Sequence, residues 1–195
     1  MDGTGDSVDT LRPDAHVASL VDVDAAGLWE RGWRGIVLDL DNTCCAYHQP
    51  ELAAGVADWV IGARDRGFKI VMLSNNFSER VAAVGAQLDV PTVPNALKPL
   101  PFGFLRALRL LGTPRRLTVV IGDQVFTDML GGKLLGLRTV LTEPIVAHDF
   151  PLTRVLRFLE RLVYKRTPPV PGRAFLRGEE QRREDDRTAQ GGSAR

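Results

Sequence analysis

The chain has 195 residues, of which 44% are hydrophobic and 25% are charged, a composition typical of one soluble globular domain with tails. Its 25 basic and 24 acidic residues leave a net charge of +1, so nothing in the overall charge favours a nucleic acid as partner. The acidic start, MDGTGDSVDT, does not resemble a signal peptide, and no apolar run approaches the roughly 20 residues of a membrane-spanning helix, so we expect a cytoplasmic protein.

Apolar runs typical of buried strands alternate with helical patterns along the chain. Strands are expected at 35–40, 68–73, 90–93, 117–121 and 137–141, and helices at about 50–66, 77–88, 101–111 and 126–135. This alternation predicts a parallel sheet with helices on both faces and a functional crevice at the carboxyl ends of the strands. We expect one domain at 13–166 between two disordered tails, 1–12 and 167–195, which are polar or rich in proline and glycine.

Most of the predicted strands are followed by a loop that carries a chemically useful side chain. In chain order these are Asp39 and Asp41, Ser74, Lys98, and Asp123 and Asp128. Each has a plain alternative: Ser74 could cap a helix, Asp128 could favour a helix N-terminus, and Lys98 could be a solvated charge. Together, carboxylates from two adjacent strand ends form a cage for a hard cation, while Ser74 and Lys98 supply donors for an anion.

The order of these motifs resembles that of the haloacid dehalogenase (HAD) superfamily of phosphotransferases. Between residues 34 and 142, DLDNT is similar to the first motif, DxDx[TV], and LSN to the Ser/Thr motif; Lys98 matches the third-motif lysine and GDQVFTD the fourth motif, GDxxxxD. DLDNT, NALKP and the short spacings resemble the YqeG-like group of subclass IIIA, whose relatives include the mitochondrial phosphatidylglycerophosphate phosphatase. Cys44 and Cys45 replace the apolar pair that tends to follow DNT there, and we expect them to be small apolar fillers.

The resemblance implies a Rossmann-like three-layer α/β sandwich with a five-stranded parallel sheet in the order 3-2-1-4-5. It also implies a Mg²⁺-dependent phosphatase in which Asp39 is the nucleophile and forms an aspartyl-phosphate, and Asp41 is the general acid and base. The remaining roles that it implies are Mg²⁺ binding by Asp39, the Asp41 carbonyl and Asp123, phosphoryl binding by Ser74, Asn75 and Lys98, and support from Thr43 and Asp128.

The segments between Asp41, Ser74 and Lys98 are largely filled by their own helices and strands. A separate cap domain would need roughly 40 residues or more, so we expect none, and an open site suits a bulky or membrane-embedded substrate. The leading substrate is phosphatidylglycerophosphate or another bulky phosphate monoester, and a soluble sugar phosphate or nucleotide is the alternative.

Two alternative hypotheses assign the chain to another class of protein, and the sequence favours them less than a phosphatase. A receiver-like phosphoacceptor module carries its metal-binding acids on the first strand and its phosphoacceptor on the third, whereas here the double acid follows the first strand. A degenerate HAD fold used only for binding is disfavoured because every motif residue is present.

Residues 150–166, FPLTRVLRFLERLVYKR, have apolar side chains at helical spacing and carry five basic residues against one acid, Glu160. This pattern predicts a basic amphipathic helix, which could pack on the sheet or contact anionic lipid. The second option would make the protein peripheral at the inner face of a membrane, with a phospholipid as its phosphorylated substrate.

Overall fold

The structure is a computed structural model and describes residues 11–46, 49 and 51–146. In this part of the chain, six parallel strands form one sheet in the order β1-β6-β5-β2-β3-β4. They are β1 (Ala15–Val17), β2 (Gly35–Leu38), β3 (Lys69–Leu73), β4 (Thr92–Val93), β5 (Thr118–Gly122) and β6 (Arg138–Thr142). The five expected strands lie in the expected order 3-2-1-4-5, but the expectation of five was wrong by one strand, β1.

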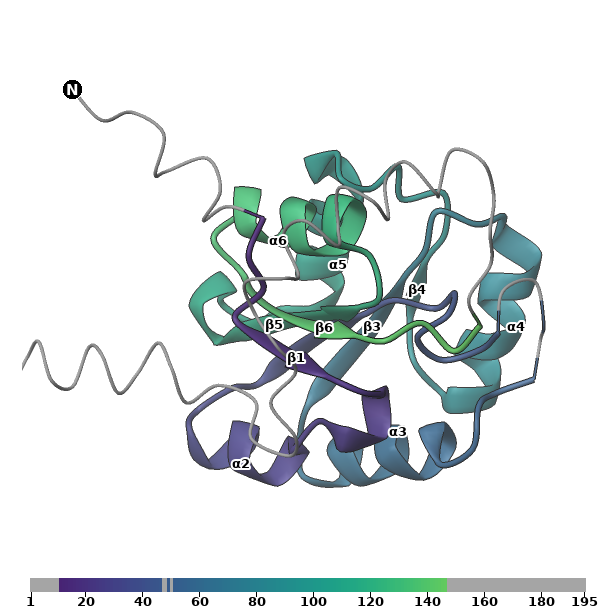
Figure 1. The fold of residues 1–195 in the computed structure, drawn as a ribbon, viewed down its shortest axis with the longest axis horizontal. Coiled ribbons are helices and arrows are strands. Elements are labelled where there is room, and N and C mark those ends of the chain that lie inside the picture. The colour runs from purple at the N-terminus through teal and green to yellow at the C-terminus, as the bar shows by residue number, and fades with distance from the viewer. Residues whose placement is uncertain (1–10, 47–48, 50, 147–195) are drawn as a thin grey trace, which may run out of the picture.

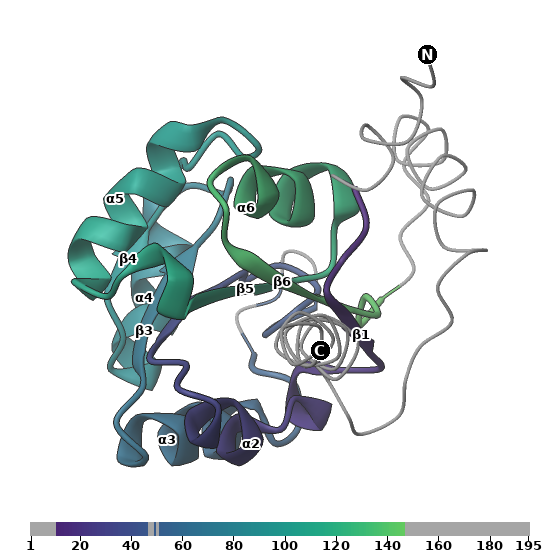
Figure 2. The same cartoon turned by 90° about the vertical axis from the view of Figure 1, so that its left-hand side faces the viewer.

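Helices cover both faces of the sheet and give the expected three layers (Figure 1, Figure 2). One face packs against α2 (Ala25–Glu30), α3 (Val56–Asp65) and α4 (Ser78–Leu88), and the other against α5 (Pro101–Leu111) and α6 (Leu130–Leu134). Three short segments are helical but not α-helical. Two of them, η1 (Leu20–Asp22) and η2 (Arg115–Leu117), are 3₁₀-helices, and η3 (Val125–Met129) is a π-helix.

Alternate residues of the central strands enter two separate cores, as the two-residue period of a strand requires. In β2, Ile36 and Leu38 pack towards α3 and α4, while Val37 packs towards α5. All three side chains are buried, which explains why the strands read as continuous apolar runs in the sequence.

Two helices and two strands differ clearly from the expected bounds, and one of them is the strand expected at 35–40, which ends at Leu38. The helix expected from residue 50 begins at Val56, because the preceding residues are tied to the turn after β2: the Ala53 amide donates to the Cys44 carbonyl at 2.8 Å. The helix expected at 126–135 is divided between η3 and α6, and the strand expected at 90–93 is only Thr92–Val93.

Strand β1 lies at the edge of the sheet and pairs with β6 from Ala15↔Val140 onwards. The carboxylate of Asp14, just before β1, accepts hydrogen bonds from Arg138 at 2.7 Å and from the Thr139 amide at 2.8 Å, and Lys133 lies 2.8 Å away. A three-residue strand has little intrinsic stability, so these contacts hold the edge of the sheet together.

No helix in the described ranges combines the length and the apolar character needed to cross a membrane. The basic helix expected at 150–166, the tail at 167–195 and all but two residues of the N-terminal tail lie outside the described residues. They remain predictions.

We expect Asp14→Asn to lower the free energy of unfolding by about 1–3 kcal/mol at neutral pH, because a mostly buried carboxylate with two cationic partners is lost. Burial raises the pKa of Asp14, but Lys133, Arg138 and the Thr139 amide outweigh this and hold it below its usual range. The stability from this group is therefore present above the unfolded pKa of about 3.9 and is lost as pH falls through the lower folded pKa.

Urea unfolding of wild type and variant at neutral pH and at about pH 3 measures this difference. Asp89→Asn is the matched control, since the Asp89 carboxylate pairs with Arg64 at 2.5 Å but is exposed. A stability difference for Asp14→Asn that persists unchanged at the acidic pH would contradict the assignment.

Candidate active site

The carboxyl ends of β2 and β5 bring two of the expected acids side by side. Leu38 pairs with Ile121 in the sheet, and the amide of Asp39 donates to the Ile121 carbonyl at 2.9 Å. From this pair the chain continues to β3 on one side and to β6 on the other, so the crevice lies at the point where the strand order reverses. Asp39 and Asp123 therefore face the same crevice.

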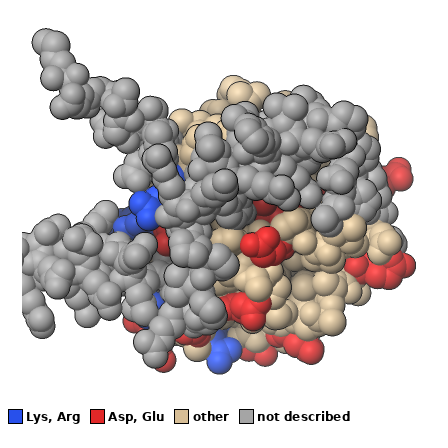
Figure 3. Space-filling model, in the orientation of Figure 1, with Lys and Arg blue, Asp and Glu red and all other residues tan. Residues whose placement is uncertain are grey.

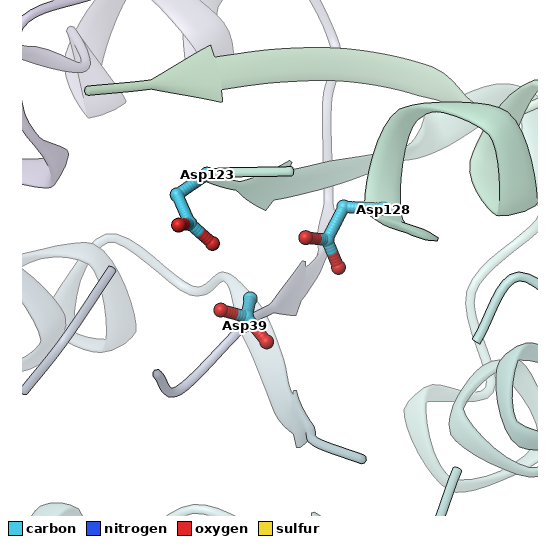
Figure 4. Close-up of side chains that lie close together, drawn as sticks. All are labelled: Asp39, Asp123 and Asp128. Carbon is cyan, nitrogen blue, oxygen red and sulfur yellow. The ribbon is translucent and has the colours of Figure 1, made fainter. Parts of the chain in front are cut away.

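Three buried aspartates converge there: Asp39 after β2, Asp123 after β5 and Asp128 in η3. One carboxylate oxygen from each lies within 4.8 Å of the others, and Figure 4 shows the three side chains pointing towards one another. Gly122 makes room for this, because a Cβ there would lie 2.5 Å from Cγ of Asp128. Asp128, expected only in a supporting role, thus lies inside the acidic cluster.

Lys98 is the cation that faces this cluster. Its Nζ donates to Oδ1 of Asp39 and, at 2.6 Å, to Oδ1 of Asp128, and all three side chains are buried. Asp128 also accepts weak hydrogen bonds through Oδ2 from the Gln124 amide and the Thr127 hydroxyl, both at 3.3 Å. Asp128 is therefore fixed in position and in turn fixes the lysine.

The electrostatics of the cluster favour a further positive charge. Burial raises the pKa of Asp39 to about 7, with Lys98 opposing the rise and Asp128 adding to it. Burial also acts to lower the pKa of Lys98, but Asp128 and Asp39 outweigh it and leave the pKa raised. Lys98 is thus a fixed ammonium that contacts the carboxyl groups of Asp39 and Asp128.

The second acid, Asp41, has a different environment. Its Oδ2 accepts a hydrogen bond from the Ser74 hydroxyl at 3.2 Å, and its Oδ1 forms an ion pair with Arg80. Asp41 is only partly buried, while Ser74 is fully buried. Two acids two residues apart in sequence therefore have different partners.

Arg80 is the site residue that sequence reasoning missed. Besides Asp41, its guanidinium binds the carbonyls of Ala46 at 3.3 Å and of Gln49 at 2.5 Å, so it joins the start of α4 to the loop after β2. One signal was available: an arginine in the first turn of a helix opposes the helix dipole, which suggests another role for its charge.

Asn75 joins the loops that carry Ser74 and Lys98. Its side chain accepts from the Lys98 amide at 2.6 Å and donates to the Lys98 carbonyl at 3.1 Å. The Asn76 amide also donates to the Ser74 hydroxyl at 3.0 Å. The side chain of Asn75 thus positions Lys98, which leaves its backbone amide as the group that could hold a phosphoryl oxygen.

The turn after β2 is tightly packed. Cys44 and Cys45 are fully buried in the core, which confirms that they act as small apolar fillers, and Cys44 donates to the Asp39 carbonyl with 3.2 Å between sulfur and oxygen. Thr43 is buried as well, and its hydroxyl makes no hydrogen bond with the described residues. The supporting role expected for Thr43 therefore remains a prediction.

The donor set fits a hard divalent cation. Oδ2 of Asp39 is buried and has no hydrogen-bond partner among the described residues, although burying such an oxygen alone is costly. The oxygens nearby are carboxylates, which are the ligands that Mg²⁺ prefers. Asp39 and Asp123 could hold the ion as expected, while both carboxylate oxygens of Asp128 already accept hydrogen bonds.

Comparison with known proteins places the chain in a family. The family described as haloacid dehalogenase-like hydrolase matches residues 39–136, which include every residue of the clusters described above. The protein named "Probable phosphatase YqeG" of Bacillus subtilis (strain 168) is 34% identical over 151 residues, which are 77% of this chain and 88% of that protein. The chain belongs to the haloacid dehalogenase-like hydrolase family.

This haloacid dehalogenase-like hydrolase has more distant relatives. A protein of Arabidopsis thaliana named "Phosphatidylglycerophosphate phosphatase 1, chloroplastic/mitochondrial" is 26% identical over 79% of this chain. The match covers 47% of that relative, so this chain spans about half of its length. A crystal structure of a HAD phosphatase from Thermococcus onnurineus has 20% sequence identity and a TM-score of 0.45, covering 56% of this chain and 58% of the other. The family assignment matches the resemblance found in the sequence and excludes the receiver-like alternative.

We expect Mg²⁺ to raise the melting temperature of the wild-type protein and to do so much less in Asp123→Asn. At roughly 100 times its dissociation constant, one bound ion should add about 5–10 °C for a chain of this size. Asp65→Asn removes an exposed acid from α3 and serves as the matched control. An equal Mg²⁺ shift in Asp123→Asn and wild type would show that the ion binds elsewhere.

Proposed function

We propose that this chain is a Mg²⁺-dependent phosphatase that hydrolyses a phosphate monoester through an aspartyl-phosphate on Asp39. The family makes it a hydrolase, and relatives named as phosphatases support a phosphomonoesterase. The observation that carries the proposal is the separation of two neighbouring acids: Asp39 lies in the buried cluster with Lys98, and Asp41 is held beside it by Ser74 and Arg80. Asp39 can therefore attack the phosphorus atom, while Asp41 donates and accepts protons.

In the first half-reaction, a carboxylate oxygen of Asp39 attacks the phosphorus and the bond from phosphorus to the alcohol oxygen breaks. Asp41 donates the proton that the leaving oxygen needs. In the second half-reaction, Asp41 takes a proton from a water molecule, whose oxygen attacks the same phosphorus. Inorganic phosphate leaves and the Asp39 carboxylate is restored.

The remaining site residues reduce the repulsion between a dianionic phosphate and the Asp39 carboxylate that attacks it. Asp39, Asp123 and the Asp41 carbonyl would hold Mg²⁺, which when bound neutralises charge on the phosphoryl oxygens. Lys98 provides a second positive charge, and Asp128 keeps it in place through their 2.6 Å contact. The Ser74 hydroxyl and the Asn75 backbone amide are assigned to the phosphoryl oxygens.

The leading substrate is phosphatidylglycerophosphate or another bulky phosphate monoester. The described segments between Asp41 and Lys98 are filled by α3, β3, α4 and β4 and contain no separate cap domain over the site. The relatives from Arabidopsis thaliana and Chlamydomonas reinhardtii named for phosphatidylglycerophosphate also support this substrate. A soluble sugar phosphate or nucleotide remains the alternative.

Substitution of the two acids should affect different steps. Asp39→Asn should abolish turnover of p-nitrophenyl phosphate and the acid-stable covalent phosphoryl label, because the acceptor oxygen is lost. Asp41→Asn should slow turnover by about 10²–10⁴-fold, the usual loss when a general acid and base is removed, while keeping the acceptor. Acid-quench labelling measures both, and a label retained in Asp39→Asn would mean that the roles are assigned wrongly.

Phosphate release from a substrate panel tests the substrate class. The panel contains dispersed phosphatidylglycerophosphate, sugar phosphates, nucleotides and phosphopeptides, with Asp39→Asn as the background and EDTA as the metal-free arm. We expect the highest kcat/KM for the lipid phosphate and no release in EDTA. Higher kcat/KM for a sugar phosphate or nucleotide would contradict the substrate but not the chemistry.

A further inference from the structure

Four large apolar side chains are exposed beside the loops that carry Ser74 and Lys98. We call them the apolar rim: Phe77 is 80% exposed, Leu97 62%, Leu100 50% and Phe102 65%. Single exposed apolar residues are common, but four on neighbouring segments at the mouth of a site form a patch.

Backbone contacts hold the segments of the apolar rim together. The Asn95 amide donates to the Asn76 carbonyl at 3.1 Å, so the residue before Phe77 lies beside the loop that carries Leu97. The Leu100 amide donates to the Leu97 carbonyl at 2.9 Å. Gly103, the neighbour of Phe102, packs so closely on Ala96 that a Cβ there would lie 2.5 Å from the Ala96 carbonyl oxygen. The four side chains therefore project from segments whose backbones are in contact.

Leu97 is held in a backbone conformation that a leucine rarely adopts. Its φ is +55°, in the left-handed region where glycine or asparagine is usual, at a cost of roughly 1–2 kcal/mol. The core does not explain this strain, because the side chain is exposed. The strained residue directly precedes Lys98, so the apolar side chain projects from the loop that supplies the phosphate-binding lysine.

The chain segment that carries Leu97, Leu100 and Phe102 is basic, whereas Phe77 is followed by exposed Glu79. Between Asp89 and Asp123 the chain contains no acidic residue, and α5, which starts at the rim, carries exposed Arg106 and Arg109. Phe102 and Arg106 are four residues apart and so lie on the same side of the helix. By contrast, the face in Figure 3 shows many Asp and Glu side chains and few Lys or Arg, and α5 lies on the far side from it (Figure 2).

We propose that the apolar rim docks on an anionic lipid surface, with Phe77, Leu97, Leu100 and Phe102 entering the boundary of the acyl chains. Arg106, one turn along α5 from Phe102, then lies at the level of the lipid phosphates. This combination of apolar and basic side chains is the one by which interfacial helices bind anionic bilayers. The proposal rests on the proposed function, because docking here presents the site to a phosphate carried by a lipid headgroup.

The apolar rim contains no residue of the segment 150–166, so substitutions in the rim leave the sequence of that segment unchanged. Full-length protein is mixed with phosphatidylcholine vesicles that contain increasing phosphatidylglycerol, and sedimentation measures the bound fraction. Phe77→Ser/Phe102→Ser should weaken binding by about tenfold or more, because two large apolar side chains no longer leave water. Arg106→Glu/Arg109→Glu should weaken it by at least about twentyfivefold, since each lost basic residue accounts for about fivefold.

Ile61→Ser is the matched control, because Ile61 is an exposed apolar residue, 47% accessible, on α3, which lies at the face of the sheet opposite to α5 and outside the apolar rim. It should bind as wild type does. An environment-sensitive fluorophore on Leu100→Cys should shift to the blue with phosphatidylglycerol vesicles, while the same label on Ile61→Cys should not. Native Cys44 and Cys45 are buried, which keeps the labelling selective.

Unchanged vesicle binding by Phe77→Ser/Phe102→Ser would contradict the docking proposal. So would a fluorophore on Leu100→Cys whose emission does not shift when vesicles are added. Self-association that this double variant removes, without vesicle binding by the wild type, would assign the rim to a second copy of the chain and also overturn it. Wild-type hydrolysis of soluble p-nitrophenyl phosphate is followed separately. If it proceeds while the vesicle tests fail, only the docking is wrong; if it fails while the rim still binds vesicles, only the proposed function is wrong.

Discussion

The buried contact of Lys98 with Asp39 and Asp128 is the interaction on which the site depends. It joins the end of β2, the loop before α5 and the π-helical η3, which are far apart in the sequence. Removing the lysine would leave two buried carboxylates facing each other, a change that typically costs about 3–5 kcal/mol. Asp123 adds a third carboxyl group beside Asp39 and Asp128, and such a set of oxygen donors suits a divalent cation. Stability and proposed chemistry thus have the same electrostatic origin.

Most of the fold could be predicted from the sequence because the central strands are buried on both faces and read as continuous apolar runs. The alternation with helices then fixed the parallel sheet and the edge at which the site lies. β1 could not be found in this way, because its three residues have no distinctive pattern and are held by Asp14 and by pairing with β6. The early part of the helix expected at 50–66 was misjudged because tertiary contacts of Ala53 with Cys44 override local propensity.

The candidate site was predictable where residue type and position at a strand end are both encoded locally, as for Asp39 and Asp123. Arg80 was missed because its link to Asp41 spans 39 positions and depends on how α4 meets the loop after β2. Phe102 and Phe104 are two residues apart in α5, yet only Phe104 is buried, since the two side chains lie on different sides of the helix. Sequence spacing could not separate the two without knowing which side of the helix meets the sheet.

The central claim is that Asp39 accepts the phosphoryl group in a pocket shared with a metal ion. Its most direct test is a crystal structure of the wild-type protein with Mg²⁺ and beryllium trifluoride, which mimics a phosphoryl group bonded to a carboxylate. The account predicts continuous density from a carboxylate oxygen of Asp39 to beryllium, Mg²⁺ beside Asp123, and Lys98 and Ser74 on the fluorides. Beryllium bonded to Asp41 or to Asp128, with Asp39 free, would contradict it.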